Sequence, residues 1–205
     1  MIHQALNLLH HELEEYLQNR LGPNTENYAE LSNVGQIENE NATGLDGKVV
    51  VSLVNIEEES TLKNNPHFKK TINGGVRYEN PPVYLNLYLL FTAFFPPTPD
   101  GYRESLGRLS SVIEFFQGKH VFNLRNAPGF LINEPDLADI QLILNLYTMT
   151  FEQINHLWGS LGGKQIPFVM YKARLVRMLD RRQTGSGMLI EEIENNIGST
   201  QAPGR

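Results

Sequence analysis

The segment His11-Glu12-Leu13-Glu14-Glu15 is the part of this sequence closest to a metal-binding motif. A helical zinc site needs two histidines four positions apart on one helix face. Glu15 stands where the second histidine would be, and His3 and His10 do not complete a ligand set with it. A solvated face of an N-terminal helix is therefore the better interpretation.

Other residues that could take part in catalysis or in phosphate binding also lack the neighbouring residues that such sites require. Acid–base catalysis needs a carboxyl whose pKa is raised by burial, whereas the run Glu57-Glu58-Glu59 is typical of a solvated strand end. Neither Gly74-Gly75 nor Gly162-Gly163 precedes the Lys-Ser/Thr of a phosphate loop. Ser110-Ser111 lies inside a predicted helix, where a nucleophile elbow is not expected. The sequence thus predicts no enzyme, cofactor or metal.

The composition of the chain further restricts the kinds of protein that it can be. The 205 residues include no cysteine, which excludes thiolate zinc sites and cysteine nucleophiles. A net charge of −6 provides no basic field for phosphates, so we expect no nucleic-acid partner. Apolar runs are too short to span a bilayer, and no secretory signal is present. We therefore expect a cytoplasmic protein that does not insert into a membrane.

The N-terminal half predicts a helix followed by strands. An apolar stripe with steps of three and four residues predicts a helix over 2–21 that stops at Gly22-Pro23. Polar residues 23–46 indicate a loop with room for a short edge strand, and β-branched residues 48–56 indicate a strand. Residues 57–80 are interpreted as a polar insertion.

Residues 83–95 carry the clearest strand pattern of the chain. The odd-numbered and the even-numbered residues of this segment are both apolar or half-apolar, which indicates a central strand covered on both faces. A helix ending at Gly118 follows it. The apolar stripe predicted to bury that helix consists of Tyr102, Leu106, Leu109, Ile113 and Phe116.

The remaining elements are a strand, a helix and a last strand. Residues 140–147 alternate as a strand, and Thr150 with Gln153 has the form of a capping box. The short helix that follows has a stripe made of Phe151, Ile154, Trp158 and Leu161. Residues 168–179 indicate the final strand. The predicted fold class is therefore α/β (α+β), with a mixed sheet flanked by helices over residues 1–180 and a polar tail over 181–205.

Two features leave alternatives open. Trp158 could anchor an interface, but its place in a helical stripe favours core packing. The basic residues Lys172, Arg174 and Arg177 of the last strand fit either a charge-protected edge strand or a charged oligomer surface.

Three blocks of the chain together resemble the tail-terminator, or tube-cap, proteins of bacterial contractile injection systems. The first block is the N-terminal helix starting at Met1-Ile2. The second runs from Val83 to Ala93 and continues through the helix that ends in Phe115-Phe116. The third comprises residues 157–162, Pro167 and Tyr171-Lys172-Ala173-Arg174.

This resemblance implies a phage tail-terminator-like fold without catalytic or metal residues. It also implies a ring of six copies on the last layer of the inner tube, which ends tube growth and contacts the sheath. The partners would then be further copies of the chain, the inner tube protein and the sheath protein, and the chain would become part of the particle. The alternative is a cytosolic adaptor that acts as a monomer or dimer.

We expect contacts with these partners to lie mainly in segments too polar to join the core. The insertion over 57–80 and the tail after Asp180 are long, and each holds a small apolar patch. The predicted interface residues are Phe68, Lys69, Lys70, Ile72, Lys172, Arg174, Arg177, Met188, Leu189, Ile190 and Ile193.

Overall fold

A computed structural model of the chain describes residues 2–36, 44–59, 68–70, 75–79, 83–130, 140–178 and 183–188. The chain divides into two compact units. The first comprises Met1–Lys63 and Val83–Met178, and the second comprises Asn64–Pro82 and Leu179–Arg205. The scheme of one domain over 1–180 and a tail over 181–205 stays a prediction.

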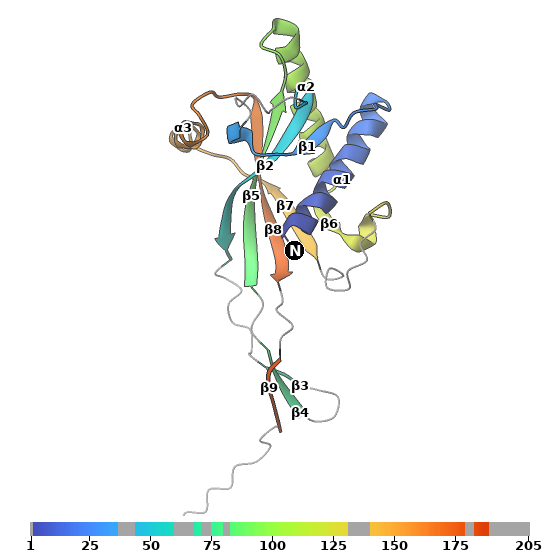
Figure 1. Cartoon of the computed structure of the whole chain (residues 1–205), viewed down its shortest axis with the longest axis vertical. Helices are drawn as coiled ribbons and strands as arrows, with labels where there is room; N and C mark the ends of the chain where they lie inside the picture. Colours follow the sequence, from blue (N-terminus) through green and yellow to red (C-terminus); the bar gives the residue numbers. More distant parts are fainter. Residues whose placement is uncertain are drawn as a thin grey trace, which may run out of the picture. The chain divides into compact units, whose positions relative to one another are not determined.

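The first unit is built on a six-stranded sheet in the order β1-β2-β5-β8-β7-β6 (Figure 1). Its strands are β1 (Ala29–Leu31), β2 (Lys48–Glu58), β5 (Val83–Phe94), β6 (Val121–Asn123), β7 (Gln141–Leu146) and β8 (Phe168–Met178). β1 pairs with β2 in parallel, and the other described pairings are antiparallel. The mixed sheet predicted from the sequence is thus confirmed.

Helices cover this sheet on both faces. α1 (Ile2–Leu21) and α2 (Pro99–Gly118) lie on one side, and α3 (Phe151–Ser160) lies on the other (Figure 1). Short 3₁₀ turns occur at Val34–Gln36 and Leu124–Asn126. The predicted fold class, a mixed sheet flanked by helices, is confirmed.

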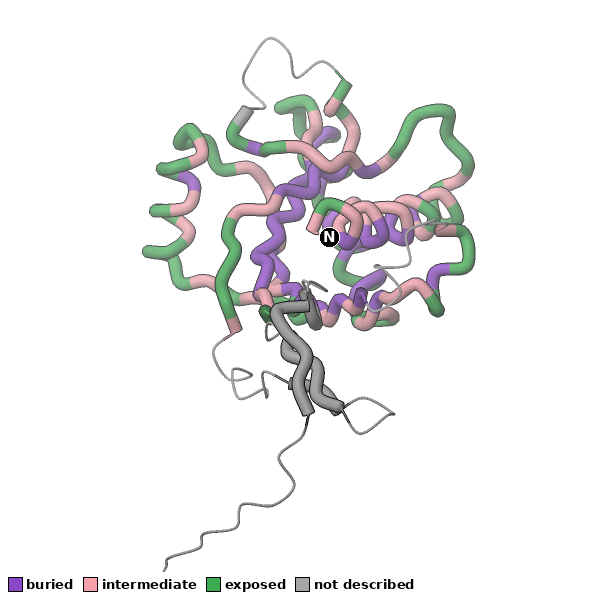
Figure 2. Tube along the Cα trace, turned by 60° about the horizontal axis from the view of Figure 1, so that its bottom comes forward, coloured by how far each residue is buried: buried purple, intermediate pink, exposed green. Residues whose placement is uncertain are grey.

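β5 lies inside the sheet and contributes side chains to the cores on both of its faces. It pairs with β2 on one edge and with β8 on the other, and residues 86–93 are all buried. Because neighbouring side chains of a strand point to opposite faces, such a run requires cover on both sides. The buried segments along the strands are visible in Figure 2.

The larger core joins α1 and α2 to the sheet. From β5 it takes Leu87, Leu89 and Phe91, and the ring of Phe91 packs edge-on against Phe116 and Tyr171. The α1 side chains buried in it are Ala5, Leu8, Leu9, Leu13 and Leu17. This is the stripe that the helical spacing predicts, with small shifts.

The smaller core lies under α3 on the other face. Trp158 is 5% exposed and packs edge-on against Phe168, beside Leu90 and Met170. The expected core position of this tryptophan is therefore confirmed. The capping box is also present, because Thr150 accepts from the Gln153 backbone N–H and Gln153 accepts from that of Thr150.

The buried faces of two helices differ from the prediction. On α2, Tyr102, Leu106 and Ile113 are exposed by 57%, 44% and 40%. The residues that α2 buries are Gly101, Ser105, Leu109, Ser111, Val112, Phe115 and Phe116. On α3, Phe151 has the helical spacing of the stripe that Trp158 defines, but at the first helical position it is 92% exposed.

The second unit contains a small antiparallel sheet in the order β3-β4-β9. Its strands are β3 (Phe68–Lys70), β4 (Gly75–Glu79) and β9 (Gln183–Met188), and Gly75 pairs with Met188. The polar insertion and the polar tail thus each contain strand structure. β3 and β4 pair locally, whereas the pairing of β4 with β9 joins segments about a hundred residues apart in sequence, which polar composition does not reveal.

Candidate assembly surfaces

Two residues of the segment closest to a metal motif, Glu12 and Leu13, are buried. Glu12 is buried, and its carboxylate accepts a hydrogen bond from the Lys119 ammonium, which also donates to the Asn126 carbonyl at 2.7 Å. The solvated face predicted for this helix is therefore wrong at Glu12. Within the described ranges, no group of three or more His, Cys, Asp or Glu side chains could hold a metal ion.

Glu14 of the same helix also has a structural partner. Its carboxylate accepts from the backbone N–H groups of Tyr28 and Ala29 at 2.8–3.0 Å. These donors lie where the chain enters β1, a strand of three residues. Glu14 therefore fixes the edge of the sheet to α1.

The sheet carries a polar cluster on its α3 side, which we call the tyrosine face: the buried residues Asn86 and Tyr88 together with Glu57, Lys172 and Arg174. The Tyr88 hydroxyl donates to Glu57 at 2.7 Å, and the Asn86 amide donates to Glu59 at 3.0 Å. The Lys172 ammonium lies 5.7 Å from the centroid of the Tyr88 ring. Cross-strand pairing places all five residues on one face.

Burial raises the pKa of Tyr88 to about 12, and the hydrogen bond to Glu57 and the charges of Glu57 and Glu59 add to the shift. The phenol is thus held in its neutral, donating form. It cannot act as a base at neutral pH, but it orients Glu57 at the surface.

Lys172 and Arg174 do not lie on an edge strand. β8 runs between β5 and β7, so the edge-strand interpretation of its basic residues is wrong. Lys172 is half-buried and Arg174 is exposed, at positions opposite Tyr88 and Asn86. Their role as interface residues stays a prediction.

The other predicted interface residues lie at strand positions of which only the backbone is described, or outside the described residues. Phe68, Lys69 and Lys70 form β3, Arg177 lies in β8 and Met188 ends β9. Ile72, Leu189, Ile190 and Ile193 are outside the described part of the chain. Their contacts stay predictions.

Sequence reasoning missed the exposed apolar residues of the first unit. Tyr102, Leu106 and Ile113 lie along one side of α2, and Phe151 stands at the start of α3. Apolar spacing predicts a core position for them, because spacing alone does not reveal which side of a helix meets the sheet. Exposed apolar side chains that lie together can mark interaction surfaces.

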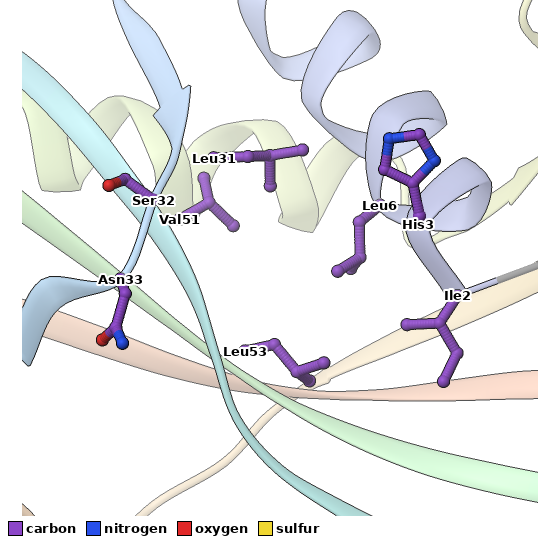
Figure 3. Close-up of a pocket in the computed structure, with 8 residues that line it drawn as sticks. All are labelled: Ile2, His3, Leu6, Leu31, Ser32, Asn33, Val51 and Leu53. Carbon is purple, nitrogen blue, oxygen red and sulfur yellow. The ribbon is translucent and has the colours of Figure 1, made fainter.

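Described residues of the first unit line two hollows. One, of about 420 Å³, lies between the start of α1 and β2, where Ile2, Leu6 and Leu53 form its apolar wall (Figure 3). His3 lies at its border and bonds the Asn7 amide at 3.0 Å. The second, of about 580 Å³, lies between the end of α3 and the segment after β5. Both can accept apolar side chains.

The fold described above is that of a tail terminator. Two solved structures are similar to it: the sheath/tube terminator of the extracellular contractile injection system PVC in the extended state, and the tube-terminating cap of the anti-feeding prophage, AFP. Their TM-scores are 0.64 and 0.61, at 14% and 13% sequence identity. They are matched by 100% and 93% of this chain, which spans 65% and 59% of their own lengths.

The chain belongs to the Pvc16 N-terminal domain family, which matches residues 5–192. A comparison with curated proteins found no match. The resemblance to tail terminators of contractile injection systems, drawn from three sequence blocks, is therefore confirmed at the level of family and fold. Among the described helices, none combines the length and apolarity needed to cross a bilayer.

Proposed function

We propose that this chain caps the inner tube of a contractile injection particle, where it ends tube growth and contacts the end of the sheath. The family match over residues 5–192 is the observation that carries the proposal. The similarity of the whole chain to a sheath/tube terminator supports it. The chain would be made in the cytoplasm and become part of the particle.

The cap would be a ring of six copies with the inner tube protein and the sheath protein as partners. A ring requires two different surfaces on each copy, because each copy contacts its neighbours head to tail. We assign these contacts to the exposed residues Glu57 and Arg174 of the tyrosine face, to the apolar side of α2, and to the 57–80 and C-terminal segments. No catalytic role is part of this proposal, since the charged groups with described contacts bond structural partners.

The test is particle assembly with the gene for this chain present, absent or restored. Without the chain, we expect tubes of irregular length and particles without a terminal ring in negative-stain electron micrographs. Restoring Arg103→Ala, an exposed change on α2, should return uniform lengths and serves as a control for expression. The adaptor alternative would be favoured if particles made without the chain were uniform and capped. It would also be favoured if the chain were found only as a free monomer or dimer.

A further inference from the structure

Arg108 of α2 is a half-buried cation packed against two aromatic rings. Its guanidinium carbon lies 4.4 Å from the centroid of the Tyr28 ring and 5.9 Å from that of the Phe95 ring. These rings come from the entry to β1 and from the segment after β5. The Tyr28 ring is itself fixed, because its hydroxyl donates to the Gly22 carbonyl at 3.1 Å. The guanidinium therefore has a defined place on the first unit.

The charge of Arg108 is not compensated within the described part of the chain. None of the described ion pairs includes it, and its buried Nη1 donates no hydrogen bond. Glu104, one turn earlier on α2, is exposed and forms no described pair with it. The carboxylate of Glu14 is occupied by the backbone N–H groups of Tyr28 and Ala29.

Lys119 shows the usual treatment of a half-buried cation in this fold. Its ammonium bonds the Glu12 carboxylate and the Asn126 carbonyl. A charge that loses its hydration without such a partner destabilises the folded copy. The rings return part of this cost through cation–π attraction, but an uncharged side chain of similar length would pack on them with no charge to desolvate. A partner outside the copy explains the arginine better.

A carboxylate is the group that fits this partner. A guanidinium that packs on an aromatic ring can still donate N–H bonds at its edge, and its planar fork matches the two oxygens of a carboxylate. The half-buried residue leaves part of the group open to a ligand. Arginine and tyrosine are also among the residues that contribute most at the centres of protein interfaces.

The charge of the chain identifies the source of the carboxylate. The sequence holds 23 acidic and 17 basic residues, so copies placed side by side bring together surfaces with an excess of carboxylates. Like charges across an interface are unfavourable, and a cation of one copy that meets a carboxylate of the next removes part of the repulsion. An uncompensated arginine on an acidic chain is therefore complementary to a second copy of the same chain.

We propose that Arg108 binds a carboxylate of the neighbouring copy, with the Tyr28 ring as the platform that holds the guanidinium. The inference rests on the proposed cap function, in which copies form a ring, and it names one contact between neighbours. It also assigns a cost to the single copy, which carries an unpaired charge until it assembles.

Arg108→Met separates a role in assembly from a role in the fold. Methionine keeps the packing on the rings and removes the charge, so the urea midpoint of the purified full-length chain should stay the same or rise. The amount of chain in purified particles, measured by immunoblot, should fall at least about tenfold, because the neighbour's carboxylate loses its partner. Arg103→Met, an exposed change on the same helix, should alter neither quantity. A lower midpoint for Arg108→Met, or unchanged incorporation, would overturn the inference.

Zero-length cross-linking identifies the source of the carboxylate. Arg108→Lys keeps the positive charge and supplies an amine, which a water-soluble carbodiimide joins to a contacting carboxylate as an amide. The reaction is done on assembled particles and on the purified full-length chain. We expect a covalent dimer in which mass spectrometry finds residue 108 joined to an Asp or Glu of a second copy. The natural chain is the control, because its guanidinium does not form this amide.

The outcomes distinguish the two proposals. A dimer linked through residue 108, together with the expected behaviour of Arg108→Met, supports the contact. A link to the tube or sheath protein, a link only within one chain, or no link through this residue overturns the contact and leaves the cap function standing. Particles that never contain the natural chain overturn the cap function. The contact between copies then stands only if the purified chain gives the linked dimer.

Discussion

At the scale of single residues, Glu12 shows how a charged side chain can become part of an apolar core. It is 8% exposed between α1 and the segment after α2, and its described partner is Lys119. A carboxylate in such a place is tolerated because a hydrogen-bonded cation compensates part of its desolvation.

Removing that cation should therefore cost stability. We expect Lys119→Met to lower the free energy of unfolding by about 2–4 kcal/mol, because it leaves the Glu12 carboxylate buried without its partner. Urea unfolding at pH 7 measures the change. Glu114→Gln breaks the exposed Arg20–Glu114 pair and should change stability by less than about 1 kcal/mol. Equal effects of the two variants would contradict the burial of Glu12.

Tyr88 predicts a pH dependence in the alkaline range. Its pKa is raised from 10 to about 12, so between these values the folded state keeps a proton that the unfolded state has lost. The free energy of unfolding should therefore fall as the pH rises through this window. Tyr88→Phe should make the fall between pH 10 and 12 smaller, as measured by urea unfolding.

The matched control for this experiment is Tyr102→Phe, which removes a phenol that is 57% exposed on α2. If the free energy of unfolding falls with pH equally steeply in Tyr88→Phe and in the natural chain, the hydroxyl is not held in the Glu57 contact.

At the scale of elements, α2 separates two kinds of apolar residue. Leu109 is 7% exposed and faces the sheet, whereas Ile113 is 40% exposed. Leu109→Ala should lower the free energy of unfolding by about 2–5 kcal/mol, the range for a large-to-small change in a core. Ile113→Ala should cost less than about 1 kcal/mol. Thermal melts of both variants test this, and a larger effect at Ile113 would place the buried face of α2 elsewhere.

Sequence patterns predicted the helices and strands that are specified by residues close to one another in the chain. The bounds of α1, the capping box of α3 and the central position of β5 followed from periodicity and from residue types at helix starts. The buried face of α2 did not, because Gly101 and Ser105 occupy it without any apolar signal. Gly101 packs so close to Pro96 that an added Cβ would lie 2.2 Å from its carbonyl oxygen. The Ser105 hydroxyl bonds the Tyr102 carbonyl and is thus satisfied when buried.

The surfaces were harder to predict than the elements. Whether β8 is an edge or an inner strand depends on pairing with β5 and β7, which lie far from it in sequence. Lys172 and Arg174 could therefore be assigned to a strand but not to a place in the sheet. Phe151 has the spacing of a core residue, and only its position at the helix start leaves it exposed.

At the scale of the whole molecule, the C-terminal segment can be removed without touching the six-stranded sheet. Deleting 183–205 takes β9 from β4 but leaves every strand of the first unit. We expect the melting temperature reported by Trp158, the single tryptophan of that unit, to change by less than about 4 °C. We also expect particles built with this variant to have irregular tube lengths or missing caps.

A matched deletion of 189–205 keeps β9. Comparison of the two deletions therefore distinguishes the contribution of this strand from that of the residues beyond it. Uniform, capped particles from the shorter chain would show that the C-terminal segment does not contribute to assembly. A large loss of the Trp158 transition would show that the first unit depends on it.

The place of β5 between β2 and β8 also sets the timing of folding during synthesis. When β5 leaves the ribosome, β2 is available to pair with it, but β8 and the helices α2 and α3 are still to be translated. At about 5–20 residues per second this interval lasts several seconds. Throughout it, a strand as apolar as β5 presents an unpaired edge, the kind of surface that aggregates. We therefore expect the nascent chain to require a ribosome-associated chaperone until β8 has emerged.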